Sequence, residues 1–373
     1  MWAETLIPLL QAGGHEMVVI APVPEGVAHS DAELENAGIV VHRYSVPYFD
    51  TDPFANGDRE FYARQTEALL ARVAPLIASG WAEVLVIGNE TFIPGIPALA
   101  RRAGIPTIAV AHTIYWTRDH GRREVNFGPG GVFENLASCD HVVCVARHAE
   151  AGLRALGLDH VTTIPNAVDL GRFSPRRHAS AVDRVAEIPA GVRVVSHVAN
   201  LKPVKQAWRL IEAAPRILER HPETVFLLMG EGPCEADLRT RCDRLGLDGH
   251  VRFLGWVERR SMPECYLRSD VVALPSASEC APFALLEALA CGCPVVSTPI
   301  DAAEELLTGM PGGFIARSEE PEAIAATVCE ALAYAADRRR RDETARAAAA
   351  RFDVRRTAVR FSAFIDDARC RQG

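Results

Sequence analysis

The stretch SASECAPFALLEALACGCP, residues Ser276–Pro294, decides the fold of the second half of the chain. It follows an apolar run, Asp270–Leu274, that is typical of a buried strand. Pro282 suits the first position of a helix and Gly292 is a usual residue at a helix end, so we expect a helix between them. Another apolar run, Pro294–Ser297, comes next. A strand, a loop, a helix and a second strand in this order predict a parallel α/β sheet.

Two glutamates flank the start of this helix. Glu279 lies in the loop before it and Glu287 lies inside it. Free backbone N–H groups at a helix start bind anions such as a diphosphate. The helical part of the gap between them covers about 7 Å, since a helix rises about 1.5 Å per residue, and this is comparable to a pyrophosphate with a sugar at either end. Carboxylates accept hydrogen bonds from vicinal hydroxyls, so the pair could hold two sugar rings. The alternative is a capped surface helix with two solvated glutamates.

Short runs rich in Val and Ile alternate with helical patterns along the rest of the chain. The other expected strands are Val18–Ala21, Val84–Ile87, Thr107–Val110, His141–Val145, Arg193–Val198, Val225–Met229 and Val251–Leu254. The expected helices include Ile96–Ala103, Ala207–Glu219 and Cys234–Leu245. This alternation predicts an α/β protein with two doubly wound, Rossmann-like domains that face a cleft. In such sheets ligands bind beyond the carboxyl ends of the strands.

Residue composition places the boundary between the two domains. We expect an N-terminal domain over residues 1–172 and a C-terminal domain over 191–350. The stretch 173–190 is polar, contains two prolines and is interpreted as a linker. Residues 351–373 are expected to form a C-terminal helix, and whether it returns to the first domain is open. The arginine run Arg338–Arg341 is interpreted as a solvated helix face.

Charge and hydropathy exclude several classes of function. The 373 residues carry a formal net charge of −8, so bulk charge gives no support for a nucleic-acid partner. No apolar run approaches the roughly 20 residues that span a bilayer. The first ten residues lack the features of a signal peptide, and we expect a cytoplasmic protein whose ten cysteines are thiols.

The run from Glu279 to Glu287, followed by ALACGCPVV, resembles the Glu-x7-Glu signature of the retaining glycosyltransferases of family 4, which have the two-domain GT-B fold. Further matches to that family are dense between about residues 104 and 313. They are AHT (Ala111–Thr113), IPNAVDLGRFSP (Ile164–Pro175), LLMGEGP (Leu227–Pro233) and VRFLGWV (Val251–Val257).

The resemblance implies a site for a nucleoside-diphosphate sugar. Glu279 would orient the transferred sugar and Glu287 would anchor the ribose. The helix start would bind the diphosphate, and the donor-binding residues there are Phe283 and Ala284. Lys205 matches a family lysine that contacts the diphosphate, which suits a compact cation facing a leaving group.

Two positions depart from the family pattern. Where the family has arginine in its G-R-L-x-x-x-K-G motif, this chain has Asn200, and Lys202 could supply the missing cation or be solvated. Where the family has Gly-Gly-x-x-Glu, this chain has Asp301-Ala302-Ala303-Glu304-Glu305, which leaves the donor sugar open.

The acceptor side would come from the first domain. His112 follows an expected strand, and the resemblance implies that it contacts the reacting centre, although a buried structural histidine is the alternative. Tyr115 and Trp116 could stack on an acceptor ring or belong to the core. Arg147, together with His148, is assigned to the acceptor side.

The resemblance thus implies a hexosyltransferase that retains anomeric configuration and uses a nucleoside-diphosphate sugar, with UDP expected because the family often uses it; neither a metal nor a cofactor is expected. The expected acceptor is small and soluble, such as an aglycone, a cyclitol or a thiol precursor. Alternatives are a glycolipid or cell-envelope glycosyltransferase, a nucleotide-sugar epimerase, or an inactive nucleotide-sugar-binding protein. Nothing in the sequence indicates the oligomeric state.

The beginning of the chain raises a separate expectation. Residues Met1–Ala12 have the pattern of the helix that, in this family, follows a first strand and a glycine-rich loop. Residues His15–Ala21 then correspond to a second strand. We therefore expect the first strand of the N-terminal domain, about 15 to 20 residues with its loop, to be missing from this sequence.

Overall fold

The computed structural model describes residues 2–24, 31–46, 59–88, 95–112, 131–175, 188–189 and 191–370. The chain divides into two compact units. Unit 1 consists of Met1–Asn166 and Val354–Gly373, and unit 2 consists of Ala167–Asp353.

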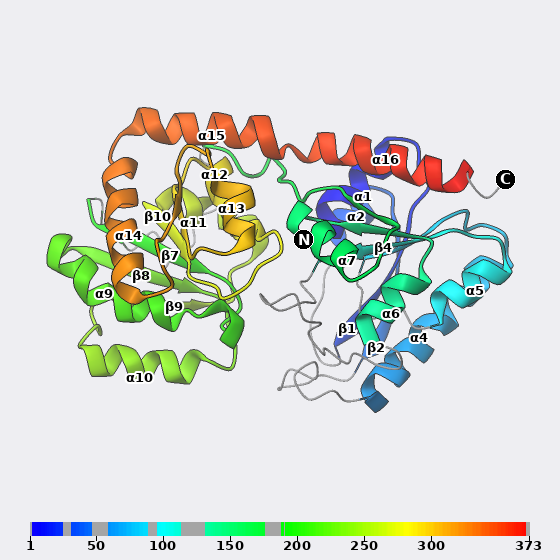
Figure 1. Ribbon diagram of the computed structural model, residues 1–373, viewed down its shortest axis with the longest axis horizontal. Coiled ribbons are helices and arrows are strands. Elements are labelled where there is room, and N and C mark those ends of the chain that lie inside the picture. Colours follow the sequence, from blue (N-terminus) through cyan, green and yellow to red (C-terminus); the bar gives the residue numbers. More distant parts are fainter. Residues whose placement is uncertain are drawn as a thin grey trace. The chain divides into compact units, whose positions relative to one another are not determined.

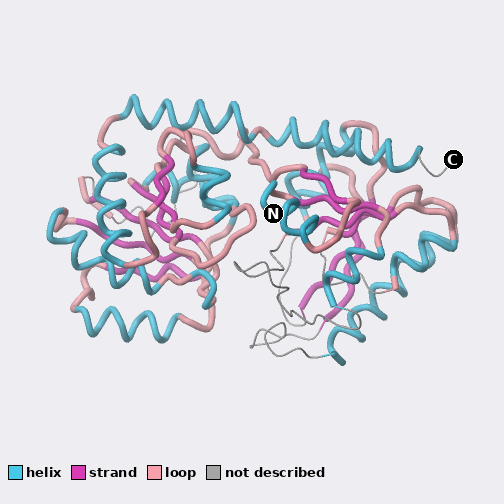
Figure 2. Tube along the Cα trace, in the orientation of Figure 1, coloured by secondary structure: helices cyan, strands magenta, loops and turns pink. Residues whose placement is uncertain are grey.

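Unit 2 is one parallel sheet with helices on both faces (Figures 1 and 2). Its strands are β7 (Arg193–Val198), β8 (Thr224–Met229), β9 (Val251–Gly255), β10 (Val271–Leu274), β11 (Val295–Ser297) and β12 (Gly313–Ile315). Its helices are η2 (Pro203–Lys205), α9 (Trp208–Arg220), α10 (Glu235–Leu245), η3 (Arg259–Ser261), α11 (Met262–Arg268), α12 (Phe283–Ala290), α13 (Asp301–Leu307), α14 (Pro321–Ala335) and α15 (Arg338–Phe352).

The strand order in unit 2 is β12-β11-β10-β7-β8-β9, and each neighbouring pair is parallel. Successive strands run outward in one direction from β7 to β9 and in the other from β10 to β12. The order therefore reverses between β7 and β10, which lie side by side. In a doubly wound sheet, such a reversal opens a crevice at the carboxyl ends of the two strands.

Successive side chains of a strand point to opposite faces of the sheet, so alternate residues of these strands pack in two separate cores. Val195, Val271 and Ala273 belong to the core that also contains residues of α9, α10 and α14. Val194 and Val272 belong to the core that also contains residues of α11, α12 and α15. Because both faces are covered, the strands are nearly continuous apolar runs, and this explains why they could be predicted from the sequence.

Unit 1 contains two parallel sheets in its described part, β1-β2 and β3-β4-β5-β6. The strands are β1 (Val18–Pro24), β2 (Val40–Val46), β3 (Leu85–Ile87), β4 (Thr107–Ala111), β5 (His141–Cys144) and β6 (Val161–Thr163). The helices are α1 (Trp2–Ala12), α2 (Ala32–Asn36), α4 (Arg59–Ala78), α5 (Ile96–Arg102), α6 (Gly131–Ser138), α7 (Arg147–Ala155) and α16 (Val354–Cys370). The expected additional first strand stays a prediction.

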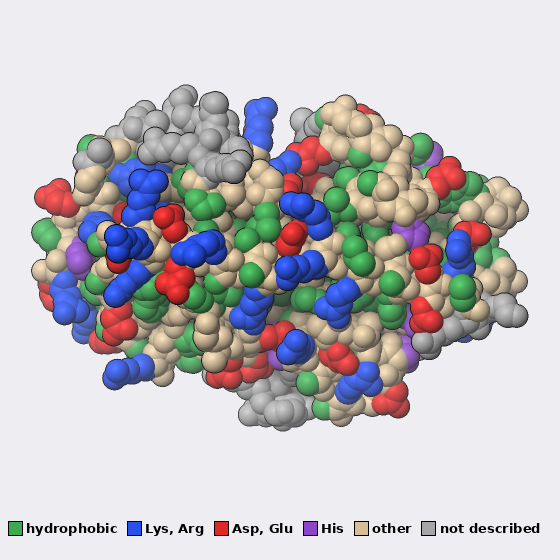
Figure 3. Space-filling view, turned by 90° about the horizontal axis from the view of Figure 1, so that it is seen from above, with side chains coloured by type: hydrophobic (Ala, Val, Ile, Leu, Met, Phe, Trp, Pro, Cys, Tyr) green, Lys and Arg blue, Asp and Glu red, His purple; other side chains and the backbone are tan. Residues whose placement is uncertain are grey.

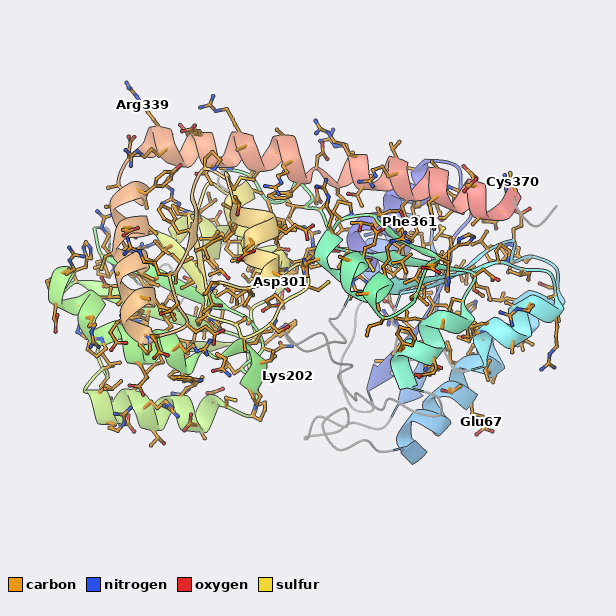
Figure 4. The ribbon with its side chains drawn as sticks, in the orientation of Figure 1. Glu67, Lys202, Asp301, Arg339, Phe361 and Cys370 are labelled. Carbon is orange, nitrogen blue, oxygen red and sulfur yellow. The ribbon has the colours of Figure 1, made fainter. Side chains whose placement is uncertain are left out.

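The last helix, α16, packs on α1 in unit 1. Phe361 points from α16 into the interior and is 1% exposed (Figure 4). His15 Nε2 and Ser362 Oγ are 2.7 Å apart, and Arg360 donates a hydrogen bond to the carbonyl of Thr163. These contacts join the end of the chain to residues near its start and to the β6 segment.

The stretch 173–190, expected to be a linker, contributes to unit 2 where it is described. Phe173 and Ile188 are both buried in the core shared by α11 and α12. The boundary between the two units falls earlier, between Asn166 and Ala167, and the chain passes from unit 2 back to unit 1 between Asp353 and Val354. These two connecting segments lie side by side, because Val168 forms a β-bridge with Asp353 and its N–H donates to the carbonyl of Phe352.

The arginines at the start of α15 lie on its surface. Arg338, Arg339 and Arg340 are exposed, and Arg339 points away from the ribbon (Figure 4). Arg341 is different, because its guanidinium donates hydrogen bonds to the carbonyls of Gly292 and Ser269 at 3.1 Å each. Seen from the α15 side, basic and acidic side chains are mixed (Figure 3). Three of the four arginines thus form the predicted solvated face, and Arg341 instead fastens α15 to the end of α12.

Candidate functional site

The crevice between β7 and β10 is where the sequence-predicted donor residues of unit 2 gather. The segment after β7 carries Asn200, Lys202 and Lys205, and the segment after β10 carries Glu279 and leads into α12. Ala277 donates its N–H to the carbonyl of Val204 at 2.9 Å, which ties the two segments together. The reversal of strand order therefore brings residues more than 70 positions apart in the sequence into one site.

The centre of this site is an ion pair. Lys205 Nζ donates to both oxygens of Glu279, at 2.7 Å to Oε1 and 2.8 Å to Oε2. The lysine side chain is 24% exposed and the glutamate side chain 8% exposed. Since partial burial weakens solvent screening, each charge stabilises the other more than it would on an open surface. The pair presents one cation and one carboxylate side by side.

Two hydroxyl residues fix the position of Glu279. Ser276 is fully buried and its Oγ donates to Glu279 Oε1 at 2.7 Å. Thr298, which follows β11, donates from Oγ1 to the carbonyl of Ser276 at 2.5 Å. Glu279 is thus held from the β10 and β11 side as well as by Lys205. Ser276 and Thr298 were not predicted from the sequence, because serine and threonine at strand ends are common and carry no distinctive signal.

The loop after β8 packs backbone to backbone on the segment that carries Lys202 and Lys205. The N–H of Leu201 donates to the carbonyl of Glu231 at 2.8 Å. Gly230 has a φ of +132°, and a Cβ there would lie 2.1 Å from the carbonyl oxygen of Ala199. Only glycine fits this conformation and this approach. The glycine of LLMGEGP at position 230 therefore allows the loop after β8 to lie directly against the backbone of Ala199.

The start of α12 offers backbone donors. Pro282 precedes the helix in an extended conformation and makes no side-chain cap. The next two residues, Phe283 and Ala284, are half-buried. A helix N-terminus carries a partial positive charge and unsatisfied N–H groups, which favour an anion. The helix boundaries agree with those predicted from Pro282 and Gly292, since α12 ends at Ala290 with Cys291 as its C-cap.

Glu287 lies in the interior, on the second turn of α12, and is 4% exposed. The hydroxyl of Tyr266, on α11, donates to Glu287 Oε2 at 3.0 Å. A guanidinium nitrogen of Arg259 lies 3.6 Å from Glu287 Oε1. Burial raises the pKa of Glu287 above its ordinary value, while Arg259 and the Tyr266 hydroxyl act in the opposite direction. Neither Tyr266 nor Arg259 was predicted from the sequence.

Two further predicted donor residues, Asn200 and Lys202, lie on the same unit, as does Asp301, which begins the segment that departs from the family pattern. Asn200 is exposed directly after β7. Lys202, labelled in Figure 4, is half-buried. Its N–H donates to the carbonyl of Asn200 at 2.8 Å. Asp301 is exposed at the first position of α13, and the alanines that follow it are buried. The backbone of α13 therefore begins where the family motif has its glycine pair.

The predicted acceptor-side residues belong to unit 1. His112 follows β4 and is half-buried, and Arg147 is the exposed first residue of α7. Tyr115 and Trp116 lie outside the described residues. The structure thus brings together Lys205 and Glu279 and places Glu287 further along α12. The roles of all the named residues stay predictions.

One buried histidine near the site was missed. His197, the penultimate residue of β7, is fully buried, and its Nδ1 lies 3.0 Å from the carbonyl oxygen of Ala273. A carbonyl only accepts, so Nδ1 carries the proton of the neutral ring. Burial lowers the pKa of His197 to about 4, and the nearby charge of Lys205 lowers it further against the effect of that hydrogen bond. The imidazole is therefore neutral at ordinary pH.

Two family models match consecutive halves of the chain. The model described as "Glycosyltransferase Family 4" matches residues 2–172, and the model described as "Glycosyl transferases group 1" matches residues 181–348. The chain belongs to glycosyltransferase family 4. It is an enzyme of the transferase class, as the Glu-x7-Glu run predicts.

Curated relatives of this family 4 glycosyltransferase include enzymes named for inositol-containing acceptors. A GDP-mannose-dependent alpha-(1-6)-phosphatidylinositol dimannoside mannosyltransferase of Mycobacterium tuberculosis is 27% identical over 85% of this chain and 79% of its own length. A D-inositol 3-phosphate glycosyltransferase of Actinosynnema mirum is 31% identical over 54% of this chain and 52% of its own length.

Solved structures show that the fold is GT-B. HepE of Anabaena, in complex with UDP and glucose, superposes with a TM-score of 0.73 at 18% identity, covering 98% of this chain and 96% of that one. A sucrose-phosphate synthase of Thermosynechococcus elongatus has a TM-score of 0.74 at 18% identity, covering 97% and 91%. Within the part of the chain that the structure describes, every helix is too short or too polar to span a bilayer.

Proposed function

We propose that this glycosyltransferase moves a hexose from a nucleoside-diphosphate sugar to a hydroxyl acceptor with retention of anomeric configuration. The observation that carries the proposal is the Lys205–Glu279 ion pair in the crevice between β7 and β10, beside the uncapped start of α12. A nucleoside-diphosphate sugar is anionic at its diphosphate and rich in hydroxyls at its sugar. The site offers a cation and backbone N–H donors for the diphosphate and a carboxylate for the sugar hydroxyls.

In the proposed complex the donor replaces the ion pair by two new contacts. Lys205 turns to the diphosphate, and Glu279, still held by Ser276, accepts hydrogen bonds from sugar hydroxyls. The N–H groups of Phe283 and Ala284 bind phosphate oxygens. As the bond from the anomeric carbon to the phosphate oxygen breaks, these donors stabilise the charge that develops on the leaving diphosphate.

The acceptor hydroxyl attacks the same face of the anomeric carbon that the diphosphate leaves. Its oxygen forms the new glycosidic bond, and its proton passes to an oxygen of the leaving phosphate. Retention then needs no covalent sugar–enzyme intermediate. Glu279 is held by Ser276 and accepts hydrogen bonds from the sugar hydroxyls, so this route gives it no role as a nucleophile. His112 of unit 1 is the proposed residue at the reacting centre.

The names of the relatives suggest which donor and which acceptor to propose for this chain. GDP-mannose is in the names of relatives that match most of the chain, and this favours GDP-mannose over the UDP-sugar that the family resemblance led us to expect. Their acceptors, phosphatidylinositol mannosides and D-inositol 3-phosphate, share a substituted inositol ring. We therefore propose a cyclitol as the chemistry of the acceptor, either free as a phosphate or carried on a lipid.

The test is a panel of GDP-mannose, UDP-glucose and ADP-glucose in thermal-shift and binding assays. Nucleotide release is then followed with inositol phosphate in one arm and phosphatidylinositol vesicles in the other, and NMR of the product reports anomeric configuration. Lys205→Met and Glu279→Ala are each expected to lower turnover about ten- to a hundredfold, since each removes a hydrogen bond to a charged group.

Arg216→Met provides the control. Arg216 pairs with Glu322 at 2.8 Å on the exposed surface of α9 and α14, so its loss should leave turnover unchanged. The proposal fails if no nucleotide sugar binds, or if Lys205→Met transfers sugar as fast as the unmodified protein. Isomerisation of the donor without acceptor would identify an epimerase instead, and binding without turnover would identify a binding protein.

A further inference from the structure

The carboxylate of Glu287 is buried, and only one of its two oxygens accepts a hydrogen bond from the described residues. Oε2 accepts the hydrogen bond from the Tyr266 hydroxyl at 3.0 Å. Oε1 is buried and has no hydrogen-bond partner among the described residues. Arg259 approaches Oε1 only to 3.6 Å, which is beyond hydrogen-bonding distance. Buried acceptors are normally paired, so an unpaired carboxylate oxygen calls for a ligand or another explanation.

Tyr266 is built into the core in a way that fixes where its hydroxyl points. Its side chain is fully buried, and its ring lies 6.0 Å from the ring of Phe173 at an interplanar angle of 60°. Packing of the ring leaves the hydroxyl little freedom, and a buried phenol needs a hydrogen-bond partner. That partner is Glu287, which lies 21 positions further along the chain on α12.

Arg259 is held over the same aromatic ring. Its guanidinium carbon lies 5.7 Å from the centre of the Phe173 ring, and its side chain is 18% exposed. The cation is thereby kept near Glu287 without closing a direct hydrogen bond to Oε1. Phe173 thus contacts both the residue that binds Oε2 and the residue that supplies the positive charge.

We propose that Tyr266 is a positioning residue that holds Glu287 by Oε2 so that Oε1 is presented to a hydroxyl of the nucleotide donor. The proposal rests on the proposed function, because it takes the ligand of Oε1 to be a ribose hydroxyl. Arg259 favours the charged form of the carboxylate and so acts against the effect of burial on its pKa. A carboxylate that could rotate would satisfy itself with other partners, whereas a carboxylate tied at one oxygen offers the other in a fixed direction.

The charges around Glu287 set how the arrangement responds to pH. Arg259 faces it from η3, Tyr266 from α11, Arg172 from the segment after β6, and Cys291 from the end of α12 itself. The Tyr266 hydroxyl bonds to the charged form of Glu287 and therefore lowers the pKa of that carboxyl against the effect of burial. Removing the hydroxyl raises this pKa, so donor binding is lost at a higher pH.

The variant that tests the proposal is Tyr266→Phe, which keeps the ring and removes only the hydroxyl. Donor affinity, measured by titration calorimetry with the tightest-binding nucleotide sugar, is expected to fall about tenfold, with little change in kcat. The midpoint of the loss of donor binding on acidification is expected to move to higher pH. A tyrosine with a merely structural role would not move this midpoint.

Tyr334→Phe is the matched control. Its hydroxyl bonds to the carbonyl of Arg340 at 3.1 Å, between α14 and α15, and donor affinity should not depend on it. Arg259→Gln is the second variant and removes the cation while leaving Tyr266 in place. It should move the pH midpoint in the same direction, and it keeps the proposal testable if Tyr266→Phe does not fold.

The outcomes separate the two proposals. If the unmodified protein binds no nucleotide sugar, the proposed function fails. If the protein binds donor and Lys205→Met weakens transfer, but Tyr266→Phe binds donor with unchanged affinity and pH midpoint, the function stands and the positioning role is refuted. An unchanged midpoint in Arg259→Gln likewise refutes the role given to Arg259.

Discussion

Replacing Gly230 by alanine should damage unit 2 far more than its position in a surface loop suggests. Backbone strain at a φ of +132° costs a residue with a side chain about 1–3 kcal/mol. The new Cβ would lie 2.1 Å from the carbonyl oxygen of Ala199 and 2.8 Å from its carbonyl carbon. Because both contacts are with backbone, no side chain can move aside, and overpacking of this kind adds about 1–3 kcal/mol. The sum is about 2–6 kcal/mol.

In a unit the size of Ala167–Asp353, each kcal/mol lowers Tm by about 2–4 °C, so Gly230→Ala should lower it by about 4–24 °C. Calorimetry measures the transition, and hydrogen exchange of peptides covering residues 193–205 and 224–234 assigns it to this unit. Gly246→Ala is the control, because Gly246 also has positive φ, +67°, but no atom within 4 Å of the added Cβ. It should cost only about 1–2 kcal/mol. Equal shifts in Tm for the two variants would refute the argument from close approach.

Two other predictions concern pH and metal ions. His197 has a pKa of about 4 in the folded protein against about 6.5 when unfolded, so below pH 6.5 the unfolded chain takes up a proton that the folded chain does not. The free energy of unfolding should therefore fall by about 3 kcal/mol between about pH 6.5 and pH 4 because of this residue. The Tm of His197→Gln should depend less on pH over that range than the Tm of the unmodified protein. Parallel curves of Tm against pH for the two proteins would contradict this. Sugar transfer should survive EDTA and gain nothing from Mg²⁺ or Mn²⁺. The triplet Asp50-Thr51-Asp52, outside the described residues, carries two carboxylates that could share a divalent ion, so loss of activity in EDTA would end the metal-independent mechanism.

Much of unit 2 could be predicted because its strands are buried on both faces. The run Arg193–Val198 was predicted with the bounds of β7, and the other runs predicted in this half fall within one residue of the observed strand ends. The strands that were missed lack that signal. Val40–Val46 mixes polar and apolar residues, and Val161–Thr163 and Gly313–Ile315 are three residues each. Their pairing comes from tertiary structure rather than from local pattern.

The candidate site was predictable only in part. The sequence placed Glu279 and Lys205 in one site through their resemblance to a family, and the sheet order brings them into contact. The residues that hold them were not predictable. Tyr266 lies in an apolar helix where a tyrosine is unremarkable, and its bond to Glu287 depends on how α11 and α12 pack. Sequence patterns report which face of an element is apolar, but not which buried hydroxyl meets which carboxylate.

The placement of α16 has a consequence for how the protein is made. Unit 2 is one continuous stretch of chain, whereas unit 1 needs α16, whose residues are synthesised after all of unit 2. While the ribosome is still adding residues beyond Asp353, the surface of unit 1 that will contact Phe361 and Ser362 is uncovered. Unit 1 therefore completes its core only after unit 2 has been synthesised, because α16 follows unit 2 in the chain. A chaperone that binds apolar surface would find its target on the unit that was translated first.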